Sequence, residues 1–96
     1  MHARVGRVSF SPEKAGEMVS RVRESVVPRY EGSDGFKGFT LLVGDGTGIG
    51  ISFWESEEAM HATDEVGDQA RQAAAEAGSG TDQGMEYFEV AVDTMA

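Results

Sequence analysis

The sequence predicts a single α+β domain in which a four-stranded antiparallel sheet lies behind two helices, in the chain order βαββαβ. The length of 96 residues leaves room for one hydrophobic core, so residues 1–96 are expected to form one domain. Two stretches show the spacing of amphipathic helices. Four runs are rich in strand-forming residues, and they cover residues 3–10, 36–43, 49–54 and 85–92.

The first helix is predicted directly after the strand at 3–10. Ser11 can cap a helix, and Pro12 fits the first helical position because it needs no amide hydrogen there. Pro28 is expected to end the helix, because the residue before a proline disfavours the helical conformation. The apolar positions that predict its buried stripe are Ala15, Val19, Val22 and Val26.

The second half of the chain carries a hairpin signal and a second helix start. Asp45-Gly46 lies between the two middle strands and predicts a hairpin turn. Ser56 is expected to cap the second helix, which can break in two near Gly67, with Thr63-Asp64 as a second cap. A loop at 78–84 then leads to the last strand. The buried stripe predicted for this helix is Ala59, Thr63, Val66, Ala70, Ala73 and Ala77.

Charge and composition exclude several classes of function. The formal charge of −9 predicts repulsion from phosphate backbones and anionic lipid surfaces, so neither nucleic acid nor membrane is an expected partner. The sequence has no cysteine, no apolar run of membrane-spanning length and no signal-peptide pattern, so a cytoplasmic location is expected. Two distant histidines without a thiol predict neither a metal site nor a bound metal cofactor.

The predicted sheet is apolar on both faces, which predicts a homodimer. Ile49, Ile51 and Phe53 point to one side of their strand, and Trp54 points to the other. Two helices cover only one face of a sheet, so the second apolar face needs another cover. A second copy packed sheet to sheet about a two-fold axis is the simplest one.

Short motifs in this chain resemble the antibiotic biosynthesis monooxygenase-like family. They are Gly35-Phe36-x-Gly38-Phe39 and the run from Phe53 to Ala59, which contains Trp54-Glu55-Ser56-Glu57. The resemblance covers nearly the whole chain and implies a ferredoxin-like fold that dimerises into a dimeric α/β barrel. Some members oxidise aromatic polyketide anthrones with molecular oxygen and without metal or flavin. The resemblance therefore implies a cofactor-independent monooxygenase with no bound cofactor.

The resemblance also points to candidate site residues. It places a tryptophan that handles substrate on Trp54 and a pocket arginine on Arg71, while a pocket asparagine falls on Gly50 and a tyrosine on Met60. In the haem-degrading branch the haem-ligating histidine falls on Ala73, so haem is not expected. On this basis Trp54 and Arg71 are the candidate catalytic residues.

The residues themselves leave alternatives open at each of these positions. Trp54 is either a core plug or a stacking surface for a ligand, and Arg71 is either a surface partner of Asp68 or Glu58 or a group at a pocket edge. His61 lies on a polar helical face and is expected to be exposed. Small residues on the strand and the second helix either pack closely or leave an apolar pocket. The candidate substrate-binding residues are Gly50, Ser52, Met60, Tyr87, Phe88 and Tyr30.

Two functional hypotheses follow. The first is a small-molecule-pocket protein that acts as a cofactor-independent monooxygenase on planar aromatic, polyketide-like substrates. The second is a non-catalytic dimeric module that binds a small ligand or a partner protein. The sequence identifies neither the substrate nor the pathway.

Overall fold

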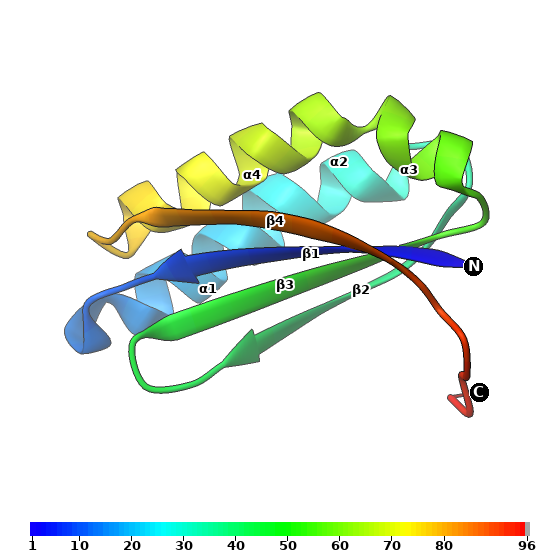
Figure 1. Cartoon of the computed structure of the whole chain (residues 1–96). Helices are drawn as coiled ribbons and strands as arrows, with labels where there is room; N and C mark the ends of the chain where they lie inside the picture. The colour runs from blue at the N-terminus through cyan, green and yellow to red at the C-terminus, as the bar shows by residue number, and fades with distance from the viewer. Residues whose placement is uncertain (96) are drawn as a thin grey trace.

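A computed structural model describes residues 1–95 and shows one sheet covered by helices on one face (Figure 1). The sheet order is β2-β3-β1-β4, and every neighbouring pair is antiparallel. This arrangement confirms the predicted α+β fold with a four-stranded antiparallel sheet. The strands are β1 (His2–Ser9), β2 (Phe36–Val43), β3 (Thr47–Trp54) and β4 (Asp82–Glu89). The helices are α1 (Ala15–Arg21), α2 (Val27–Glu31), α3 (Glu57–Ala62) and α4 (Asp64–Ala77).

The first helical segment runs past Pro28, so the prediction that the proline ends it is wrong. A 3-10 turn (Pro12–Lys14) leads into α1, and a π-helical turn (Val22–Val26) joins α1 to α2, which ends only at Glu31. Pro28 lies in the first turn of α2, directly after the π-helical turn, and the first turn of a helix tolerates proline. Ser11 takes the predicted cap position, but its side chain makes no capping hydrogen bond.

The second helix begins and breaks close to the predicted points. The Ser56 hydroxyl oxygen accepts a hydrogen bond from the Ala59 amide at 3.1 Å, and Thr63 separates α3 from α4. The buried side is rotated from the predicted stripe, because it is centred on Met60, Thr63, Gly67 and Ala74. This rotation turns Arg71 toward the sheet.

The last strand occupies Asp82–Glu89, three residues earlier than predicted. Its start lies in the segment that was expected to be a loop because it contains glycine and aspartate. The pairing with β1 shifts register between Gly6 and Val8 opposite this start, and Gly84 has a φ of 93°, which glycine adopts without strain. Because the strand starts irregularly, its first residues do not show the alternation of apolar and polar residues that is typical of a strand.

The two faces of the sheet have different surroundings. Residues that face the helices include Val8, Ser52 and Trp54, which are buried. On the open face lie Ile49, Ile51 and Phe53, which are only half-buried, while Leu42 and Phe88 are nearly half exposed. The assignment of Ile49, Ile51 and Phe53 to the side opposite Trp54 is confirmed.

Among residues 1–95, no helix has the length and apolar character needed to cross a membrane.

Candidate functional site

A cavity of about 50 Å³ lies between the sheet and the helices. Such a volume has room for about three or four water molecules. Glycines and one serine form its floor on β1 and β3, and Ala70 and Ala74 of α4 form part of its roof. Small residues on facing elements therefore leave a space, as one of the two sequence-based alternatives proposed. Its lining residues are Arg4, Gly6, Val8, Met18, Val22, Val26, Tyr30, Phe39, Leu41, Gly48, Gly50, Ser52, Gly67, Ala70, Arg71, Ala74 and Met85.

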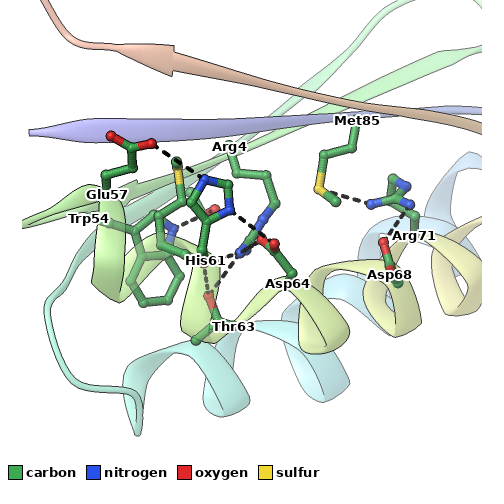
Figure 2. Close-up of polar contacts among 11 residues, drawn as sticks. Arg4, Trp54, Glu57, His61, Thr63, Asp64, Asp68, Arg71 and Met85 are labelled. Atoms are coloured by element: carbon green, nitrogen blue, oxygen red, sulfur yellow. Dashed lines mark hydrogen bonds and ion pairs between the residues drawn. The ribbon is translucent and has the colours of Figure 1, made fainter.

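Arg71 lies at one side of this cavity and links α4 to β4 (Figure 2). Its Nε donates to Asp82 at 2.8 Å, its Nη2 donates to Asp68 at 2.8 Å, and its Nη1 lies 3.0 Å from the Met85 sulfur. Only 14% of the side chain is exposed. Burial lowers the pKa of Arg71, but the two aspartates outweigh this and raise it above its ordinary value, so the guanidinium stays charged.

The Asp82 carboxylate that holds Arg71 is itself stabilised as an anion. Burial raises the pKa of Asp82, but the Gly84 amide, which donates at 2.9 Å, and the Arg71 guanidinium outweigh burial and hold this pKa below its ordinary value. Asp68 and Asp82 together therefore neutralise Arg71. The predicted partnership with Asp68 and the predicted position at a pocket edge both occur in this structure.

Arg4 is the second cation of the cavity, and only 3% of it is exposed. Its Nη2 donates to the Met60 carbonyl, and it lies 2.9 Å from both the Thr63 hydroxyl and the Asp64 carboxylate. Its guanidinium carbon lies 5.7 Å from the centre of the Trp54 ring, a cation–π distance. Its Nε and Nη1 are buried and have no hydrogen-bond partner.

Asp64 connects Arg4 to the surface of the protein. Burial raises the pKa of Asp64, but hydrogen bonds from His61, Arg4 and Tyr87 outweigh burial and keep this pKa below its ordinary value. Burial raises the pKa of Tyr87. The nearby Asp64 carboxylate raises this pKa further, because it disfavours a phenolate. His61 is exposed, as predicted, and lies 3.0 Å from Asp64.

Trp54 is fully buried and does not line the cavity. Its indole N–H donates to the Ser52 hydroxyl at 2.8 Å, and its ring packs edge-on against Tyr30 and Phe36 at centroid distances of 5.6 and 5.4 Å. In this structure Trp54 is part of the core. Arg4 contacts both Trp54 and Gly67 of α4.

The other candidate residues fall into two groups. Gly50, Ser52 and Tyr30 line the cavity together with Arg71. Met60 is buried but supplies only its carbonyl to Arg4, Tyr87 lies beside His61 with 41% of its surface exposed, and Phe88 lies on the open sheet face. These three residues do not line the cavity.

Arg4 is not among the site residues that the sequence predicts. A signal existed, because Arg4 shares its strand parity with Val8 and Phe10, two apolar residues that belong in a core. An arginine on the apolar parity of a strand is a candidate buried charge. In the part of the chain that the structure describes, no three His, Asp or Glu side chains gather to hold a metal ion.

Comparisons with known proteins place this geometry in context. No family model matches the sequence. The chain is 36% identical over 93 residues to the uncharacterized protein Rv2557 of Mycobacterium tuberculosis, covering 95% of this chain and 41% of that protein. It therefore spans about two fifths of the length of the curated relatives that it matches.

Solved structures share the fold over nearly the whole chain. A proposed antibiotic biosynthesis monooxygenase from Deinococcus radiodurans has a TM-score of 0.73 at 21% identity, with full coverage of both chains. A monooxygenase from the gene ActVA-Orf6 of Streptomyces coelicolor, in complex with nanaomycin D, has a TM-score of 0.74 at 16% identity, covering 99% of this chain and 91% of that one. This chain has the fold of the antibiotic biosynthesis monooxygenase-like proteins. Another protein of this monooxygenase-like fold is the haem degrader MhuD from M. tuberculosis, which has two haems bound in its active site; its TM-score is 0.74 at 24% identity, covering 99% of this chain and all of that one.

Proposed function

We propose that this chain binds a small molecule in the cavity between sheet and helices and acts there as a cofactor-independent monooxygenase of planar aromatic, polyketide-like compounds. One observation carries the proposal: an apolar cavity has two buried or nearly buried guanidinium groups, Arg4 and Arg71, in its wall. An apolar space with a few convergent polar groups is the usual form of a small-molecule site.

Two cations in an apolar wall suit a substrate that reacts as an anion. A guanidinium nearby favours the ionised form of a phenol or an enol, and it stabilises negative charge that develops during reaction. The substrate anion then reduces molecular oxygen directly. For an anthrone, the ring methylene becomes a carbonyl: one oxygen atom enters the product, and the other leaves as water with the two methylene hydrogens.

The size of the cavity limits how such a substrate can enter. A volume of about 50 Å³ is smaller than a tricyclic ring system, so side chains have to move when the substrate binds. Met18 and Met85 line the space, and methionine side chains are flexible enough to repack around different shapes. Widening at these two residues is the expected route of entry.

The residues of the cavity do not fit haem. The Arg4 side chain lies in the cavity wall, fixed by Thr63 and Asp64. Both histidines of the chain lie outside the cavity lining. Haem is therefore not a proposed ligand of this chain.

A non-catalytic binding module is the second candidate, and one observation favours it. Apart from the two arginines, the only ionisable side chain that the described part of the chain places in the cavity wall is Tyr30. Within these residues the site has no carboxylate or histidine to act as a general base. In such a module the same cavity holds a ligand without changing it.

The open sheet face supports a homodimer formed by sheet-to-sheet packing. Figure 1 shows helices on one side of the sheet only. On the bare side Leu42 and Phe88 are 48% and 49% exposed, and Ile49, Ile51 and Phe53 lie among them. Adjoining apolar side chains of this kind are usually covered by a partner. A second copy of the chain would bury them symmetrically.

Oxygen uptake tests the catalytic proposal. In buffer free of metal and flavin, the protein should accelerate oxygen consumption by an anthrone above the uncatalysed rate. Arg71→Ala should lower that acceleration by about 10–100-fold, because one contact to the developing anion is lost. Arg23→Ala is the matched control, since Arg23 is exposed and does not line the cavity. Quenching of Trp54 fluorescence by the anthrone without oxygen uptake would leave the binding module and contradict the oxygenase.

A further inference from the structure

We propose that Arg4 binds an anionic oxygen of the cavity ligand, so that the ligand is an aromatic molecule bearing a carboxylate, phenolate or enolate group. This inference rests on the proposed function, because it requires the cavity to be a ligand site. It assigns the recognition of the ligand to a residue of β1.

The first support is an incomplete set of hydrogen bonds. A guanidinium carries five N–H donors, and a buried one normally finds an acceptor for each. In Arg4 the single hydrogen of Nε and the two of Nη1 lie in the interior without an acceptor. Only Nη2 is used, by Met60, Thr63 and Asp64. Three donors of a side chain that lines the cavity are thus without a partner in the protein.

The second support is the absence of a side chain at Gly67. A Cβ atom at this position of α4 would lie 3.0 Å from Cδ of Arg4 and 3.1 Å from its Nε. Any larger residue would press on the guanidinium, and Gly67 also lines the cavity. Glycine inside a helix lowers helix stability, so its presence needs a reason in the packing. Here it lets the Arg4 side chain pack directly against α4 in the cavity wall.

The third support is the balance of charge. Two aspartates hold Arg71, at 2.8 Å each. Arg4 has one, Asp64, whose carboxylate also accepts from His61 and has a side chain 36% exposed. Among residues 1–95, no carboxylate lines the cavity. Arg4 is therefore the less neutralised of the two cations, and a buried charge is stabilised most by a partner that brings the opposite charge.

Paired probes test this inference. Benzoate carries the proposed anionic oxygens, and toluene has a similar shape without them. Their affinities are measured by NMR titration at neutral pH, with the single Trp54 indole N–H and the Arg4 Nε–H as reporters. We expect benzoate to bind at least about ten-fold more tightly than toluene, and we expect it to shift the Arg4 Nε–H resonance. Charge-assisted hydrogen bonds to a carboxylate are the physical reason.

Substitution identifies Arg4 as the source of the preference. Arg4→Met should remove the preference for benzoate and leave toluene binding in place, and Arg4→Lys should retain part of it. Arg23→Met makes the same change of charge at an exposed position outside the cavity and should leave both affinities unchanged. If Arg4→Met does not fold, the Arg4 Nε–H shift in the unmodified protein decides the question.

The outcomes separate this inference from the proposed function. Equal binding of benzoate and toluene, or benzoate binding without a shift at Arg4, would overturn the role of Arg4 while the pocket remains. Binding of neither probe would overturn the proposed small-molecule site, and the inference with it.

Discussion

Replacing Met18 with alanine should destabilise the fold and enlarge the cavity. Met18 is fully buried, and its methyl carbon and sulfur lie close to Gly48 in the cavity floor. Substitution of a buried methionine by alanine typically costs about 2–5 kcal/mol. If about 70 Å³ of vacated space stays open, the cavity term alone is about 1.7 kcal/mol at about 24 cal/mol per Å³. The lost transfer free energy of the side chain adds to this, so about 3 kcal/mol is expected.

The same change should enlarge the cavity and raise its affinity for small aromatic molecules. Adding the vacated space to the existing cavity of about 50 Å³ gives roughly 120 Å³, which approaches the ~150 Å³ of an engineered apolar cavity that binds benzene. Urea unfolding measures the stability, and an NMR titration with toluene measures the binding. Met85→Ala is the control, because Met85 is only partly buried and should cost less. A loss below about 1 kcal/mol, with no gain in toluene affinity, would refute the assignment of Met18 to the wall of a poorly filled space.

Further predictions concern assembly, pH and partners. Analytical ultracentrifugation at micromolar concentration should give about twice the 10.2 kDa chain mass, and Phe53→Asp should dissociate the dimer by placing a charge in an apolar interface; a stable Phe53→Asp dimer would contradict sheet-to-sheet packing. Asp64 and Asp82 have folded-state pKa values below the ordinary value of about 3.9, so the unfolded chain binds more protons in that range. The stability that they contribute is present at neutral pH and should be lost as pH falls below about 4, and urea unfolding of Asp64→Asn should show a weaker loss. Filter binding should detect no DNA affinity tighter than micromolar at physiological salt, and a salt-sensitive affinity would reveal a basic patch.

Local signals in the sequence predict most of the sheet and the helix starts. The run 36–43 alternates strand-forming residues between a glycine-containing loop and Asp45-Gly46, and it matches β2 residue for residue. Ser56 followed by two glutamates predicts the start of α3 correctly. In these places the propensity of a few neighbouring residues and the tertiary structure agree.

The differences arise where tertiary packing overrides a local rule. A proline usually breaks a helix, but Pro28 lies in the first turn of α2, directly after the π turn. The start of β4 carries loop residues, and its pairing with β1 makes it a strand. The candidate site shows the same limit, because the resemblance pointed to Trp54, which the structure places in the core, and did not include Arg4. The pairing of β1 with β3 sets Arg4 beside Ser52 and Trp54, and this contact joins distant parts of the chain.

The π turn at Val22–Val26 keeps the two ends of the first helical segment on one face. A π turn holds one residue more than the α-helical turn it replaces, so the extra residue is absorbed in a wider turn and the residues after it keep their orientation. Met18 before this turn and Tyr30 after it both line the cavity. Deleting one residue within the π turn should therefore restore a regular α-helix and leave Tyr30 at the cavity. Deleting one residue from the regular turns of α1 should instead rotate the following residues by about 100° and carry Tyr30 away from it.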